Sequence, residues 1–535
     1  MAASAAATSA QPTSRPREAS RSSLPSPPSL QLLDLPDDCL RLVCLKLGEE
    51  CFPHPLFRVC QRLRSASFDA VTRVDLYEDG DASVNTEDSH LNTCISSVED
   101  VGRFLLGCPN LRTLTLRRLY EIEDEFITPE MPTIRFGAAL GQCLPYLPLH
   151  TLYTDAAVLV SVSAHSISAT PLRELHLALE GEPEEVAERM AAALEPLKTH
   201  AATLQVLEVT LELSFEPLFE AGVRQVASLP CLRRLILSAT MTAQLMSALC
   251  VACPDVTTLD LTGTFNRGAL SALALPAFPS LSDVQIPFTG PGDITHCEWI
   301  SELASMLHGR TLDHLFLMSA AEEEDEEDPA EFIAAVSQSA QLPHTLRYYT
   351  CADSENQESA GLDDECLMQL AAAPGATTTL RSLSIELCED VTISGMKTLG
   401  QLASLQQLHL RAPFFHEDAL QPWVITQVSE LKVTCYNLPS MVDLVTALGA
   451  AAPALTGLTH LKMRTSEPLP PSAASGLGAL SLRAFDFLWV PFWMDETAPS
   501  VPPKVRAAAK KMKKWSARLW RGNVATVRCT SYLDE

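Results

Sequence analysis

Aliphatic residues recur along most of the chain in one short motif, Leu-x-x-Leu-x-Leu, whose intervening positions are mostly polar. The last two aliphatic positions are two residues apart, which is the period that places side chains on one face of a strand. The motif, or a variant with another aliphatic residue in the same positions, begins at Val71, Leu111, Leu149, Leu172, Leu204, Leu232, Val256, Leu281, Leu312, Leu346, Leu380, Leu405, Val428, Leu458 and Leu482. We therefore expect one short strand at each of these places.

Successive motifs begin 23 to 40 residues apart, and most steps lie near or a little above the ~20 to 29 residues of leucine-rich repeats. The longer steps leave room for a helix and a loop. Burying three aliphatic side chains gains about 4 to 9 kcal/mol, whereas ordering some 25 residues of backbone costs about 1 to 2 kcal/mol per residue. One repeat is unstable alone, so the repeats must stack. The prediction is an α/β fold, a curved leucine-rich-repeat solenoid with parallel strands on the concave face and helices on the convex face.

Residues 1–30 differ from the repeats in composition. They are rich in Ala, Ser and Pro and contain three arginines, Arg15, Arg17 and Arg21, with one acid, Glu18. Because no compact apolar stretch follows, we expect no secretory signal, although a plastid or mitochondrial transit peptide fits the composition. We favour a disordered tail, since the segment has too little apolar surface to offset the entropy cost of ordering.

Residues 31–70 have the periodicity of helices. Two short amphipathic helices are predicted, with apolar faces formed by Leu40, Val43, Cys44 and Leu47 and by Leu56, Val59, Cys60 and Leu63. A helical pair of this size rarely has a sufficient core of its own. Its apolar face therefore needs a partner.

The same segment resembles the F-box. The similarity is carried by Leu35-Pro36-Asp37-Asp38-Cys39-Leu40, by Val43 and Leu47, and by Val59-Cys60-Gln61-Arg62-Leu63-Arg64. The first repeat follows at once, as in F-box/leucine-rich-repeat proteins, and the lead-ins Cys108-Pro109 and Cys253-Pro254 are similar to those of that family. The resemblance implies that a Skp-type adaptor of a cullin ubiquitin ligase docks on Leu35, Pro36, Leu40, Val43, Leu47, Leu56 and Val59. The alternative is a helical cap that only closes the solenoid.

Composition excludes several classes of partner and site. The formal net charge of −27 argues against non-specific nucleic-acid binding, which needs a dominant basic face. Sixteen cysteines are scattered, with one C-x-x-C pair at Cys250 and Cys253, and we interpret them as packing thiols of a reducing compartment. No apolar run reaches the ~18 residues of a membrane span. We expect no metal, cofactor, nucleic acid or membrane, and localisation in the cytoplasm or nucleus.

Residues between the aliphatic positions should face the concave side, because strand side chains alternate. Large apolar or aromatic groups occupy these positions in the middle repeats, including Phe316 and Tyr348. The late repeats carry bases there, with Glu430 as the one acid, in a chain of 66 acids and 39 bases. The predicted substrate site, for an acidic or phosphorylated segment, therefore consists of Phe316, Tyr348, His409, Arg411, Lys432, His460, Lys462 and Arg464. The alternative is that these are ordinary solvated strand positions.

Other charged segments lie outside the repeat motifs. Acidic runs at 78–81, 182–185 and 322–328 are interpreted as solvated loops, with docking of a basic partner as the alternative. The basic segment 504–521 has an apolar stripe at helical spacing, which favours a terminal cap over a membrane-surface helix or a nuclear-import signal. The predicted domains are a tail at 1–30, an F-box-like segment at 31–70, the repeats at 71–490, and a basic cap and tail at 491–535.

Catalytic motifs are missing from the sequence. It has no phosphate-binding glycine loop, no H-E-x-x-H and no G-x-S-x-G, so we expect no enzymatic activity. The resemblance implies a substrate-recognition subunit that binds an adaptor and a cullin scaffold on one side and a protein substrate on the other. The alternative function is a leucine-rich-repeat scaffold or regulator without a ligase role.

Overall fold

The computed structural model divides the chain into two units, Met1–Ala70 and Val71–Glu535. The described residues are 68, 71–78, 84–85, 102, 104–118, 141–162, 170–179, 186–211, 216–226, 228–274, 277–291, 296–319, 329–350, 361–435, 437–465, 469–470, 475–489 and 526–531. The predicted tail, the two helices of 31–70, the acidic runs at 182–185 and 322–328 and the basic segment 504–521 lie outside these residues.

The strands of the second unit form one sheet, with 17 strands among the described residues. They are β1 (Arg73–Glu78), β2 (Val84–Asn85), β3 (Thr113–Arg118), β4 (Thr151–Asp155), β5 (Glu174–Leu179), β6 (Val206–Leu211), β7 (Arg234–Ser238), β8 (Thr258–Phe265), β9 (Asp283–Pro291), β10 (His314–Ser319), β11 (Thr345–Thr350), β12 (Ser382–Glu386), β13 (Gln407–Ala412), β14 (Glu430–Cys435), β15 (His460–Thr465), β16 (Ala484–Trp489) and β17 (Thr526–Ser531). From β3 onward each strand pairs in parallel with the next in the chain, β1 pairs in parallel with β3, and the short β2 is antiparallel to β1.

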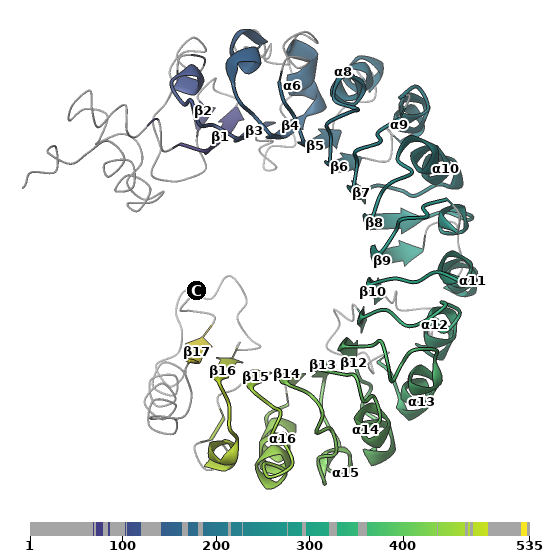
Figure 1. Ribbon diagram of the computed structural model, residues 1–535, viewed down its shortest axis with the longest axis vertical. Coiled ribbons are helices and arrows are strands. Elements are labelled where there is room, and N and C mark those ends of the chain that lie inside the picture. The colour runs from purple at the N-terminus through teal and green to yellow at the C-terminus, as the bar shows by residue number, and fades with distance from the viewer. Residues whose placement is uncertain are drawn as a thin grey trace, which may run out of the picture. The chain divides into compact units, whose positions relative to one another are not determined.

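Helices connect the strands and lie on the outer side of the sheet in this unit (Figure 1). They are η3 (Leu144–Tyr146), α6 (Ala156–Ser161), α8 (Val186–Thr199), α9 (Glu216–Val223), α10 (Ala243–Ala252), η5 (Ser271–Leu273), α11 (His296–Leu307), α12 (Pro329–Val336), α13 (Asp364–Ala372), α14 (Ile393–Gly400), α15 (Glu417–Leu420), α16 (Leu438–Ala450) and η6 (Ser475–Ala479). Several begin at a side chain that accepts a backbone N–H of the first turn, namely Asp155, Thr242, Asp363, Thr392 and Asn437. The predicted leucine-rich-repeat solenoid, with strands on the concave side and helices on the convex side, is confirmed.

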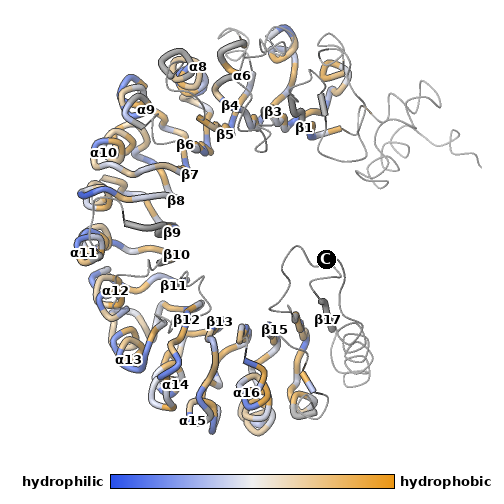
Figure 2. The backbone as a smooth tube through the Cα atoms, turned by 180° about the vertical axis from the view of Figure 1, so that it is seen from behind, coloured by the Kyte–Doolittle hydropathy of each residue, from blue (hydrophilic) through white to orange (hydrophobic). Residues whose placement is uncertain are grey.

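The core lies between the strands and the helices. The three aliphatic residues of one motif, Leu380, Leu383 and Ile385, are fully buried, and the corresponding residues of the other described repeats are nearly all buried as well. Hydrophobic stretches recur from one repeat to the next in strands and helices alike (Figure 2). The lead-in cysteines Cys108 and Cys253 are also fully buried. Burial raises the pKa of both thiols to about 12, so they are packing groups that stay protonated at neutral pH.

One predicted motif was placed three residues too late. Leu346 pairs with Leu315 of the preceding strand, so it is the second inward residue of its repeat and Pro343 holds the first inward position. Tyr348 is therefore the third inward residue: it is 3% exposed, and its ring stacks on Phe332 of α12 with 4.2 Å between centroids. The prediction that Tyr348 faces the concave side is wrong, because a proline in place of an aliphatic residue hid the start of the motif.

The sheet also continues beyond the repeats that the sequence indicated. β17 pairs in parallel with β16, in the register that joins Asp486 to Arg528. The segment assigned to a C-terminal cap and tail, 491–535, thus contributes one more strand. No helix among the described residues is long and apolar enough to cross a membrane.

A buried arginine joins two neighbouring repeats on the convex side. Arg310 follows α11 and is 3% exposed. Its guanidinium donates to the carbonyl oxygens of Phe278 and Leu273, each at 2.7 Å, and Nε donates to that of Met306 at 3.3 Å. One side chain therefore donates to carbonyl groups of the loop around η5 and of the end of α11. The carbonyl of Phe278 also accepts from the backbone N–H of Leu281 at 3.3 Å.

Candidate concave-face anion site

Strand register places one row of side chains across the concave face of the later repeats. The row runs from Arg347 on β11 through Ser384 and His409 to Lys432 on β14 and Lys462 on β15. A parallel row on the same face contains Arg411, Thr434 and Arg464. Because neighbouring strands are ~4.8 Å apart, the basic residues predicted from separate repeats are brought together in one site.

Neutral hydrogen-bonding groups form the centre of this site. Nδ1 of His409 lies 2.7 Å from Oγ of Ser384 and 2.9 Å from the hydroxyl of Tyr349, and these two hydroxyls also contact each other. On the other side of the ring, Nε2 lies 3.3 Å from Oγ1 of Thr434. Burial, and then the positive charges of Lys432 and the neighbouring arginines, lowers the pKa of His409 to about 3. The ring is therefore neutral at physiological pH, and we call Tyr349, Ser384, His409 and Thr434 the neutral cluster.

Two of the predicted bases are already paired with acids. Arg411 lies 3.6 Å from Glu386 on β12, and the ammonium of Lys462 donates to Glu430 at 2.9 Å. Each of these charges is largely compensated within the sheet. They contribute less to the attraction of an external anion than their number suggests.

The remaining bases have no acidic partner among the described residues. These are Arg347, Lys432 and Arg464, whose side chains are exposed. Burial lowers the pKa of Lys432, as do the positive charges of Arg464, Lys462 and Arg347. An ammonium whose pKa is lowered by neighbouring cations is stabilised when an anion binds between them. We call Arg347, Lys432 and Arg464 the unpaired cations.

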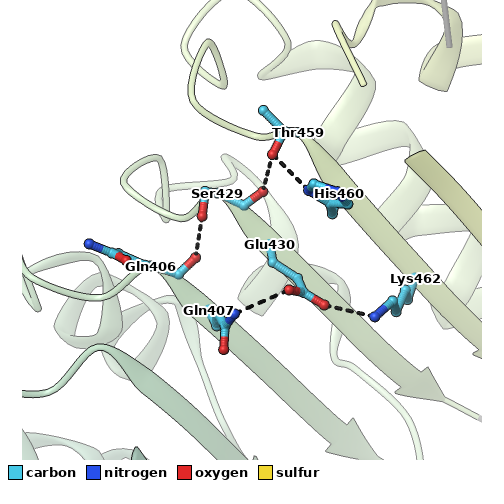
Figure 3. Close-up of polar contacts among 7 residues, drawn as sticks. All are labelled: Gln406, Gln407, Ser429, Glu430, Thr459, His460 and Lys462. Carbon is cyan, nitrogen blue, oxygen red and sulfur yellow. Dashed lines mark hydrogen bonds and ion pairs between the residues drawn. The ribbon is translucent and has the colours of Figure 1, made fainter. Parts of the chain in front are cut away.

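A hydrogen-bond network connects the strands that carry these residues (Figure 3). Nε2 of Gln407 donates to Glu430 at 3.3 Å, so this carboxylate bridges β13 to Lys462 on β15. At the strand entrances, Oγ of Ser429 donates to the carbonyl of Gln406, and Oγ1 of Thr459 donates to that of Ser429. The predicted site residue His460 belongs to this network, and its Nδ1 lies 2.8 Å from Oγ1 of Thr459. It lies one row away from Lys432.

An aromatic edge borders the site on the side of the middle repeats. Phe316 of β10 packs edge-on against Tyr349, with 5.8 Å between ring centroids, and Tyr349 packs in the same way against His409 at 5.9 Å. Phe316 is therefore where the sequence predicted it, whereas Tyr349 takes the concave position that had been assigned to Tyr348. With the motif starting three residues earlier, Arg347 also lies on the concave face.

Four functional groups were therefore missed by the sequence reading. Arg347 and Tyr349 were hidden by the displaced motif, although Pro343 in a buried position is a signal that could have found them. Ser384 and Thr434 do occupy positions between the aliphatic residues of their repeats, but a single hydroxyl at such a position does not indicate a binding site. What links them is the ring of His409, and that contact depends on tertiary structure.

The arrangement is suited to binding an anion. The unpaired cations surround the hydrogen-bonding groups of the neutral cluster. Hydrogen bonds between a cation and an anion are charge-assisted and are about twice as strong as neutral ones. His409 is a weak base at neutral pH because of its lowered pKa. Among the described residues, no group of three or more His, Cys, Asp or Glu side chains is placed to hold a metal ion.

Comparison with known proteins gives similarities at the level of solved structures. No protein-family model and no curated protein matches the chain. The complex of Rad7 and Elc1 in yeast is similar over 87% of this chain and 91% of that chain, with 13% sequence identity and a TM-score of 0.33. The leucine-rich repeat-containing protein LegL7 from Legionella pneumophila is similar over 72% of this chain and 95% of that chain, with 14% identity and a TM-score of 0.30. We draw no functional argument from similarities this low.

The neutral His409 gives a testable pH dependence of stability. Its pKa is about 3 in the folded chain, below the ordinary value of 6.5, so the unfolded state binds more protons between these values. Stability attributable to this residue is complete above pH 6.5 and falls as the pH drops toward 3, with a slope of up to about 1.4 kcal/mol per pH unit. In urea unfolding at pH 7, 6 and 5, the advantage of wild type over His409→Asn should shrink steadily. A constant difference across this range would contradict the buried, neutral ring.

Proposed function

We propose that the chain is the substrate-recognition subunit of a cullin-type ubiquitin ligase. Residues 31–70 dock on a Skp-type adaptor, and the concave face of the repeats binds a protein segment that carries acidic or phosphorylated residues. The observation that supports the second half is the set of unpaired cations around the neutral cluster. The first half is supported by the sequence of residues 31–70, whose apolar faces need a partner.

The unpaired cations favour an anionic ligand for a physical reason. The chain carries a formal net charge of −27, so a site in which bases outnumber the neighbouring acids Glu386 and Glu430 is a local reversal of sign. Like charges held together raise the free energy of the unliganded protein, and after burial they are the second cause of the lowered pKa of Lys432. A carboxylate or phosphate bound between them removes this repulsion. The overall negative charge also makes a nucleic-acid ligand unfavourable, so we infer a protein segment.

The proposed mechanism is positional and needs no chemistry from this chain. The adaptor and cullin hold the enzyme that carries ubiquitin as a thioester, and the concave face holds the substrate. A substrate lysine is thereby kept near the thioester, which converts a bimolecular transfer into a nearly unimolecular one. The role requires a rigid connection between two binding surfaces, and the protein would act in the cytoplasm or nucleus.

The adaptor half is tested by a pulldown with purified Skp-type adaptor. Leu35→Ala combined with Pro36→Ala removes apolar contact area from the first predicted helix, and we expect retention of the adaptor to fall by at least about tenfold. A matched control is Leu106→Ala with Pro109→Ala in the repeats, which changes the same residue types away from the segment. Equal retention of the adaptor by wild type and by the Leu35 and Pro36 variant would contradict the ligase role.

The second candidate function is a repeat scaffold without a ligase role. It is favoured by one observation, that the anion site is built from described residues of the repeats. The two candidates differ in what import and pulldown experiments should give. Import of residues 1–30 into an organelle, together with failure to retain any Skp-type adaptor, would favour the scaffold, because cullin ligases work in the cytosol and nucleus.

A further inference from the structure

The concave face changes sign between its earlier and later repeats. In β5 to β9 it carries acids, namely Glu174, Glu208, Asp260 and Asp283. Arg234 is a base on the same face, and its register partners are Val206 and Thr258. Thr151 donates to Glu174, and His176 lies 2.7 Å from Glu208. In β11 to β15 the unpaired cations dominate. A ligand that crosses the strands therefore meets negative and positive regions in turn.

Asp260 is the least satisfied of the early acids. Its carboxylate is half-buried on β8 and has no hydrogen bond or ion pair among the described residues. Burial raises its pKa, and so does the charge of Glu208, while Arg234 lowers it. The side chain lines a pocket of about 200 Å³ that also contains Asp283, Gln285 and Phe316. A half-buried carboxylate beside an aromatic ring is a suitable environment for a cationic side chain.

Arginines of the protein itself do not fill this pocket. Arg234 and Arg347 also line it, but both side chains are exposed and neither is within ion-pair distance of Asp260. Asp283 is already engaged, because it accepts from Ser282 at 2.7 Å and lies 3.6 Å from His314. The carboxylate of Asp260 is thus an acid in this pocket without a hydrogen-bond or ion-pair partner among the described residues.

Register places the pocket, the aromatic edge and the anion site in a single row. Asp260 pairs with Gln285, Gln285 with Phe316, and Phe316 with Arg347. The row then continues through Ser384 and His409 to Lys432. From β8 to β10 the row covers roughly 10 Å, and from β10 to β14 roughly 19 Å, at ~4.8 Å per strand. An extended peptide rises ~3.3 Å per residue, so these spans correspond to about three and about six residues.

We propose that the concave face recognises an extended protein segment with a charge order. A Lys or Arg binds in the Asp260 pocket, an apolar or aromatic residue packs on Phe316, and an acidic or phosphorylated residue binds at Lys432. The expected spacing is about three residues from the cation to the apolar group and about six from there to the anion. This inference rests on the proposed function, since it describes the substrate of the same face. It adds a second, acidic half that the anion site alone does not require.

The probes are synthetic peptides measured by fluorescence anisotropy with the full chain. The reference peptide has one Arg, one Phe and one Asp-Asp pair at the spacing above in a Gly/Ser background. A second peptide has Gln in place of Arg. A third peptide has the Phe and the Asp-Asp pair about three residues closer together. The reference peptide should bind about tenfold more tightly than either of the others. Equal binding of all three would overturn the inference, as would failure of the reference peptide to bind below about 1 mM.

Two variants of the protein separate the halves of the site. Asp260→Asn should weaken the reference peptide about tenfold and leave the Gln peptide unchanged, whereas Lys432→Gln should weaken both. Asp255→Asn, which removes the same charge from the exposed turn before β8, is the matched control and should change neither. If Lys432→Gln weakens binding and Asp260→Asn does not, the charge order is wrong while anion binding by the proposed receptor stands.

Discussion

Reversing two unpaired cations, Lys432→Glu with Arg464→Glu, should reduce binding of acidic or phosphorylated peptides by about a hundredfold. The two side chains lie on neighbouring strands of the concave face, and the charge of Arg464, after burial, lowers the pKa of Lys432. The substitutions replace two charge-assisted hydrogen bonds with repulsion. The measurement is retention of the full chain on an array of acidic, phosphorylated and neutral peptides.

A control must carry the same change of charge. Lys198→Glu alters an exposed residue in the last turn of α8 on the convex side, and it should leave retention within about twofold of wild type. Arg411 and Lys462 are poorer choices for reversal, because each is paired with an acid and its reversal would also break the sheet's own ion pairs. Undiminished retention by the Lys432 and Arg464 variant would show that the anion site is not the ligand site.

Arg310→Ala should lower the free energy of unfolding by about 3 kcal/mol. The substitution removes the guanidinium donor from the carbonyl oxygens of Leu273, Phe278 and Met306, of which Phe278 keeps the backbone N–H of Leu281. Arg310→Lys should lose less, since one ammonium replaces part of the guanidinium's hydrogen bonding. Equilibrium urea unfolding followed by circular dichroism gives the comparison.

A second arginine of the same region serves as the control for stability. Arg267 forms an ion pair with Glu298, and its side chain is 70% exposed, so solvent screens the pair. Arg267→Ala should therefore change the free energy of unfolding by less than about 1 kcal/mol. If the two arginine variants unfold at the same urea concentration, Arg310 does not hold the neighbouring repeats together.

The repeat fold could be predicted because it depends on local pattern. Alternation within each motif identifies the strand, and the inability of a single repeat to bury its three aliphatic residues requires stacking. The pattern failed where another residue type takes the place of an aliphatic one. Pro343 occupies the first inward position of its repeat, so the motif was predicted to start at Leu346. It also gave no indication of β17, which lies beyond the last recognisable motif.

The candidate site could be predicted only in part. The rows of bases followed from strand alternation, so His409, Lys432 and Arg464 were named in advance. Which bases are compensated depends on contacts between strands, such as Arg411 with Glu386, and a single motif contains no information about its neighbour's acid. Likewise, His409 was predicted as a basic group, whereas burial and nearby cations keep it neutral.

The central claim is that one chain joins a ligase adaptor to a substrate held on the concave face. Its most direct test is ubiquitin transfer in a reconstituted reaction, with a ubiquitin-acceptor lysine placed on the acidic peptide that the wild-type chain retains. We expect transfer with wild type, and loss of transfer both with Leu35→Ala plus Pro36→Ala and with Lys432→Glu plus Arg464→Glu. Transfer that is unaffected by either pair of substitutions would contradict the claim.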